Sequence, residues 1–149
     1  MVHFGFLILF FAEIFIPSFS GQSDSAEVLE VKVTGSNNDY TFFVTLKSPD
    51  TGCDQYANWW EVLSPGGDLI YRRILGHSHV NEQPFTRSGG AVPITNDQEM
   101  IVRVHMNNTG YSGNAMRGSA TKGFRPVELD RNFAIDLETS EPQPSGCAF

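Results

Sequence analysis

The sequence predicts an all-β fold, an antiparallel β-sandwich of about seven strands. Short runs of β-branched and aromatic residues recur along the chain, each bounded by Gly, Pro, Asn, Asp or Ser. Within several runs apolar and polar residues alternate, which is typical of strands with one buried face. No amphipathic helical pattern exceeds three turns. Strands of this length with turns between them indicate two packed sheets.

The strand segments follow from these runs in order. VLEVKVTG and YTFFVTLKS are joined by the turn SNND, and YANWWEVL and LIYRRIL by SPGGD, whose Pro and paired Gly supply the turn geometry. The long connection 81–98 is expected to carry only a short edge strand near Phe85, because the neighbouring proline cannot donate to a ladder. Strands are expected at 28–35, 40–48, 56–63, 69–75, 99–106 and 115–124.

The stretch YANWWEVLSPGGDLIYRRIL resembles fibronectin-III and immunoglobulin-like domains. In that family an aromatic residue on the third strand packs against the facing sheet, and a hairpin leads to the fourth strand. The resemblance covers roughly residues 27–122 and concerns architecture. The two cysteines depart from the antibody pattern, since they do not lie one on each sheet around the tryptophan.

The chain begins with an apolar run that predicts export. Residues 4–19 are apolar apart from Glu13 and a few small or proline residues, and Ser18 and Ser20 suit cleavage after residue 20. An uncleaved membrane anchor is the alternative, but the apolar run is too short and too interrupted to span a membrane. We therefore expect a signal peptide at 1–20, a sandwich domain at 21–125 and an acidic, Pro-containing tail at 126–149, in a secreted or periplasmic protein without a stable membrane span.

Charge and motif content narrow the function. The formal net charge is −7, which argues against nucleic acid as a partner. No complete catalytic motif is present: Ser78 between His77 and His79 is not a triad, because neighbours on a strand point to opposite faces. The expected function is a non-catalytic binding module whose partner is an extracellular or periplasmic protein, a glycan or a small anion.

Two cysteines, Cys53 and Cys147, are expected to form an intrachain disulfide in an exported protein. Two free thiols, or a bond from Cys147 to another chain, are the alternatives. Asn107 begins the glycosylation sequon NNT, which has meaning only in a eukaryotic host.

Three histidines form a candidate metal site. His77 and His79 share a face if the strand continues through Gly76, and His105 lies on another strand, pointing away from its Val and Met face. Three imidazoles suit a copper or zinc ion. No other cofactor is expected. A metal-dependent enzyme is the least favoured function, since it would also need an open coordination position.

An alternative site uses arginines, which engage carboxylate and phosphate groups in bidentate fashion. Candidate ligand-binding residues are Arg73, Arg87, Arg103 and Trp59. Salt bridges within the protein are the simpler explanation, because Glu61 lies opposite Arg72 and Arg73 in the predicted hairpin. His77 and His79 could likewise have a purely structural role, as hydrogen-bond partners of the backbone in the loop that follows.

Overall fold

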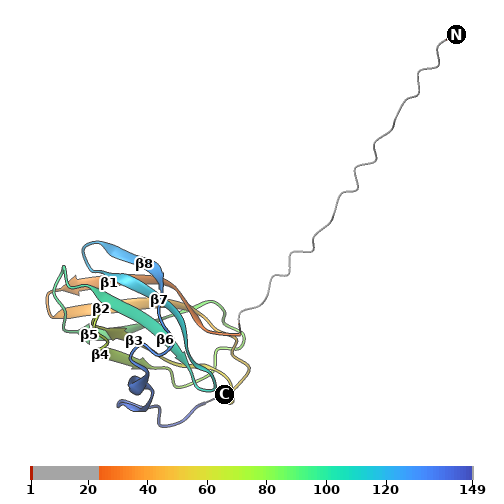
Figure 1. Ribbon diagram of the computed structural model, residues 1–149. Coiled ribbons are helices and arrows are strands. Elements are labelled where there is room, and N and C mark those ends of the chain that lie inside the picture. The colour runs from red at the N-terminus through yellow and green to blue at the C-terminus, as the bar shows by residue number, and fades with distance from the viewer. Residues whose placement is uncertain (2–23, 149) are drawn as a thin grey trace.

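The computed structural model describes Met1 and residues 24–148. Apart from Met1, the expected signal peptide lies outside the described residues. Within the described part the fold is all-β, with two antiparallel sheets, as predicted (Figure 1). The strands are β1 (Glu27–Ser36), β2 (Asp39–Lys47), β3 (Ala57–Leu63), β4 (Leu69–Ile74), β5 (Phe85–Val92), β6 (Met100–Met106), β7 (Gly110–Ser119) and β8 (Gly123–Glu128), followed by the 3-10 helix η1 (Ile135–Thr139).

The two sheets differ in size. The order is β1-β2-β5 in the smaller sheet and β4-β3-β6-β7-β8 in the larger one. Eight strands replace the expected seven or so, because the run expected at 115–124 is a hairpin of β7 and β8. Gly123 follows its turn with a φ of 74°, a backbone conformation that glycine adopts without steric cost. The expected domain boundary at residue 125 therefore falls inside β8.

The main core lies between the sheets and follows the alternation in the sequence. Phe42, Val44 and Leu46 point inward from β2, and Trp60 and Val102 meet them from the larger sheet. Such pairing of alternate apolar positions across two sheets is what fixes strand register in a sandwich.

The connection after β4 is more ordered than predicted. Its second half is β5, an eight-residue edge strand that pairs antiparallel with β2. The edge position agrees with the prediction near Phe85. Arg73 on β4 ties this edge to the larger sheet, since its Nε donates to the carbonyl of Ser88 at 2.9 Å.

The C-terminal segment covers the outer face of the larger sheet (Figure 1). A second apolar cluster forms there from Leu63, Ile101 and Ala115 of the sheet and Leu137 of η1. As a result every residue of β3 and β6 is buried, although polar residues in both strands had suggested one exposed face. The tail, expected on or beside the domain, is packed on it. No helix in the described part of the chain combines the length and apolar character needed to cross a membrane.

The predicted disulfide is confirmed: Cys53 and Cys147 are bonded, at a sequence separation of 94. It holds the chain end against the loop after β4, where the backbone N–H of Ala148 donates to the carbonyl of Gly76 at 2.9 Å. The tail is thus tethered covalently at its end and by packing along its length.

Replacing both cysteines by serine should lower the free energy of unfolding by up to about 4–5 kcal/mol, because the unfolded chain regains the entropy of an open loop of this length. Urea denaturation of the variant and the oxidised wild type measures the difference. Ser145→Ala, a change in the same tail outside the bond, is the control and should be nearly neutral. Equal stability of the double variant and wild type would contradict this role of the bond.

Candidate functional site

A buried charge cluster of Glu61, Arg72 and Arg103 occupies the centre of the larger sheet's outer face. Glu61 on β3 is in register with Arg72 on β4 and with Arg103 on β6. The Glu61 carboxylate accepts from Arg72 Nε at 2.9 Å and NH2 at 2.7 Å, and from Arg103 Nε at 2.8 Å. All three side chains are almost completely buried. The sequence hypothesis of an internal Glu61–Arg72 pair is therefore correct, whereas Arg73 instead bridges the sheets.

The remaining guanidinium donors of the cluster bind the tail. Arg72 donates to the carbonyls of Leu137, Ser140 and Pro142 at 2.6–3.0 Å. Arg103 donates to the carbonyls of Phe133 and Ala134 at 2.6 and 3.0 Å. Arg103 was expected at an exposed binding surface. It is buried because these carbonyls satisfy it from the tail.

Trp59 was a candidate ligand-binding residue, and it is only 1% exposed. The ring does point away from the main core, but His105 stacks on it at 3.8 Å between ring centroids and the Arg72 guanidinium lies 4.3 Å from its centroid. The tail and the charge cluster thus occupy the face that a ligand would need.

His105 is part of this buried layer rather than of a metal site with the other histidines. Its Nδ1–H donates to Oδ1 of Asn58 at 2.7 Å. Burial, with the nearby guanidinium groups of Arg72 and Arg103, lowers the pKa of His105 to about 3. Glu138 lies 3.4 Å from Nε2 and favours protonation, but it is one-third exposed and is outweighed. His105 is therefore neutral at physiological pH.

His77 and His79 lie together on the histidine loop, residues 75–84, which joins β4 and β5. The expected strand ends at Ile74, so the pair is not on a strand. The two ring centroids are nevertheless 4.3 Å apart. His77 is exposed and its backbone forms a bridge with Ala148 next to the disulfide.

His79 is held rigidly in the histidine loop. Its backbone N–H donates to Oδ2 of Asp50 at 2.8 Å, and its ring stacks on Phe85 at 3.8 Å between centroids. The Gln83 side-chain amide donates to the carbonyl of His79 and accepts from the backbone N–H of Ser48. These contacts tie the loop to the segment that follows β2 and to β5.

The imidazole of His79 is buried without a hydrogen-bond partner. Neither ring nitrogen makes a hydrogen bond, although Nδ1 lies 3.8 Å from Oδ2 of Asp50, and the side chain is 1% exposed. Burial lowers its pKa, with help from the charges of Arg87 and His77, while Asp50 and Glu82 act in the opposite direction. Buried polar atoms are normally satisfied, so this neutral imidazole has a lone pair and an N–H available to a ligand or water.

Glu82 and Arg87 border the histidine loop as an ion pair. The guanidinium of Arg87 donates to the carboxylate of Glu82 at 2.7 and 3.3 Å and lies over the ring of Phe85. Arg87, a predicted anion ligand, is therefore engaged within the protein. An open cavity of about 360 Å³ lies along the loop, lined by residues from His77 to Glu82.

The structure thus gathers two of the three predicted metal ligands. In residues 24–148 no group of three or more His, Cys, Asp and Glu side chains is arranged to hold a metal ion. His105 does not join this pair, because it faces the tail and its ring is engaged by Asn58 and Trp59. A metal at His77 and His79 would take its remaining ligands from solvent or a partner.

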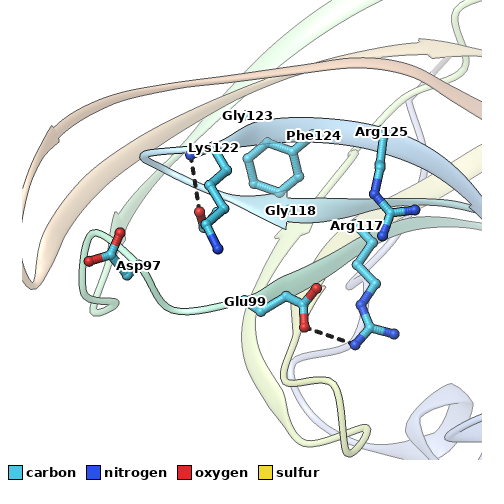
Figure 2. Close-up of a pocket in the computed structure, with 9 residues that line it drawn as sticks. Asp97, Glu99, Arg117, Gly118, Lys122, Gly123, Phe124 and Arg125 are labelled. Carbon is cyan, nitrogen blue, oxygen red and sulfur yellow. Dashed lines mark hydrogen bonds and ion pairs between the residues drawn. The ribbon is translucent and has the colours of Figure 1, made fainter.

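A second cavity was not anticipated from the sequence. It lies at the β7–β8 hairpin and is lined by charged side chains and Phe124 (Figure 2). The signal for it was the register of two arginines across the hairpin, which becomes visible only when β7 and β8 are recognised as separate strands.

Asn107 of the sequon is held in place by the fold, since its side-chain amide accepts from the N–H of Tyr56 and donates to the carbonyl of Cys53.

Glu61→Gln should lower the free energy of unfolding by about 3–5 kcal/mol, because it leaves two guanidinium groups buried without a carboxylate. Chemical denaturation measures the loss. The matched control is Glu30→Gln on the exposed face of β1, where the ion pair with Lys32 is solvated and should contribute less than about 1 kcal/mol. Similar effects at the two positions would contradict the structural role of the cluster.

Stability should fall as the pH drops below about 6.5, the pKa of an unfolded histidine, and the contribution of His105 should be lost progressively toward about pH 3. Because the pKa is lowered in the fold, the unfolded chain binds this proton at a higher pH than the folded protein does. Between the two pKa values each pH unit therefore lowers the free energy of unfolding by up to about 1.4 kcal/mol. Urea midpoints at pH 7 and 5.5 should differ less in His105→Gln than in wild type. An equal pH response would show that His105 is not buried as a neutral ring.

Comparison with known proteins gives a distant relative. A protein of Halomicrobium mukohataei named "Putative lipoprotein" is 39% identical over 97 residues, which cover 60% of this chain and 48% of the relative. The chain thus spans about half the length of the relative that it matches. No family model matches the sequence. No solved structure matches it either.

Proposed function

We propose that the protein is a binding module on the extracytoplasmic side of the cell membrane, and that its histidine loop binds a copper or zinc ion through His77 and His79. The disulfide supports the location, since such bonds persist in oxidising compartments. The name of the Halomicrobium relative also suits a cell-envelope protein. We retain the immunoglobulin or fibronectin-III type of sandwich as part of this proposal.

The unpartnered imidazole of His79 is the observation that carries the metal proposal. A buried neutral ring whose nitrogens make no hydrogen bond is in the protonation state of a metal ligand, and its stacking on Phe85 holds it in place. His77 lies beside it at the surface and can rotate, so it supplies the second imidazole and the route of entry. A zinc–nitrogen bond is about 2.0–2.1 Å long, which is compatible with neighbouring rings sharing one ion.

The surroundings of the pair favour a binding role over catalysis. Glu82 is paired with Arg87, and Asp50 accepts the backbone N–H groups of His79 and Ala57, so neither carboxylate is free to act as a base. The ion would retain open coordination positions, because two imidazoles supply only two of its ligands. A partner's side chain or a small ligand is expected to complete the coordination.

The purified, oxidised protein should bind one Cu²⁺ or Zn²⁺ per chain, and His77→Gln should weaken binding at least about tenfold, because one imidazole of the chelate is lost. Isothermal titration measures both.

His105→Gln is the control for unspecific binding to histidine, and its metal affinity should equal that of wild type. Because His77 is exposed, its replacement should leave the thermal unfolding of the metal-free protein unchanged. Absence of stoichiometric binding, or equal losses in the two variants, would exclude the proposed site.

A further inference from the structure

The cavity at the β7–β8 hairpin lies on the larger sheet beyond the area covered by the tail. Its volume is about 370 Å³, within the usual range for small-molecule sites. Figure 2 shows its charged side chains around the hairpin, with Phe124 beside Gly118, its antiparallel partner on β7. The lining residues are Asp97, Glu99, Arg117, Gly118, Ser119, Lys122, Gly123, Phe124 and Arg125.

Two arginines face each other across the hairpin. Arg117 on β7 and Arg125 on β8 are direct antiparallel partners, so their side chains leave the same face of the sheet. Like charges directly opposite each other destabilise a sheet unless an anion lies between or beside them. We call these two residues the arginine pair.

The protein neutralises the arginine pair only in part. Glu99 accepts from NH2 of Arg117 at 2.8 Å, and no other ion-pair partner of Arg117 occurs in the described residues. In that same part of the chain the Arg125 guanidinium makes no hydrogen bond and no close ion pair, and its charge acts only through space on Glu99, which Arg117 already occupies. The ammonium group of Lys122 adds a third cation to a cavity with two carboxylates, those of Asp97 and Glu99.

One donor of the arginine pair is also unsatisfied. The Nε of Arg117 is buried and has no hydrogen-bond partner. A polar atom that is shielded from water normally has a hydrogen-bond partner, so this N–H calls for an acceptor. The cavity therefore combines an excess positive charge with a guanidinium N–H that lacks an acceptor.

We propose that the arginine pair is a binding site for an oxyanion, either free phosphate or the carboxylate of an acidic ligand. Planar guanidinium groups bind such oxygens in bidentate fashion, and two of them can hold one anion from both sides. Phe124, whose ring packs edge-on against Phe42 of the core at 6.1 Å, gives the cavity a fixed apolar wall. An otherwise acidic chain would thereby attract an anion at one defined place.

Titration of the protein with inorganic phosphate and, separately, with citrate tests the site. The NMR signals of the arginine Nε–H groups and calorimetry report the binding. We expect saturable binding tighter than about 1 mM for one of the two anions, with shifts at Arg117 and Arg125. The anion that binds distinguishes a phosphate from a carboxylate ligand. Arg125→Gln should weaken binding about tenfold or more.

Two further variants make the test specific. Glu99→Gln should strengthen binding several-fold, because the competing carboxylate is removed from Arg117. Arg131→Gln changes an exposed arginine outside this cavity and should have no effect. Lack of saturable binding, equal losses in Arg125→Gln and Arg131→Gln, or weaker binding in Glu99→Gln would overturn the proposal. The site does not involve the histidine loop, so its outcome is independent of the proposed metal binding.

Discussion

The burial of Glu61 between two arginines is the interaction on which the rest of the outer layer depends. One carboxylate can balance only one guanidinium, and the donors left over must find acceptors where water is excluded. The carbonyls of residues 133–142 supply them, which makes the tail an obligatory part of the fold. The same contacts bury Trp59 and His105. A sheet that would otherwise present a solvated face therefore becomes the middle layer of the molecule.

The position of the tail also decides where ligands can bind. It covers β3, β6 and neighbouring strands, so the charged residues there are structural. The tail leaves open the histidine loop, held by the disulfide at one side, and the β7–β8 hairpin at the far edge of the larger sheet. Both contain buried polar atoms without hydrogen-bond partners, in His79 and Arg117, whereas the guanidinium donors of the charge cluster are satisfied. Unpartnered atoms also occur under the tail, in the rings of Trp59 and Tyr111, so in the two open regions it is the neighbouring cavity that makes the atom available to a ligand.

Much of the fold could be predicted from the sequence because its causes are local. Alternation in YTFFVTLKS and EMIVRVHM identified strands and their inner faces, and SPGGD set the register that places Glu61 opposite Arg72. Burial of Trp59 and Arg103 could not be predicted, since the proline-rich tail has no periodicity that would reveal its docking site. The proximity of His77 and His79 was correctly expected for a different reason, a continuing strand. Their separation from His105 depends on long-range packing, which spacing does not encode.

The central functional claim is that the histidine loop presents two imidazoles to one metal ion. Electron paramagnetic resonance of the protein with one equivalent of Cu²⁺ tests it most directly, because couplings to ring nitrogens count the bound imidazoles. The account predicts two equatorial imidazoles in wild type and one after His77→Gln, with no change after His105→Gln. A spectrum without imidazole coupling, or one that His105→Gln alters as much as His77→Gln, would contradict it.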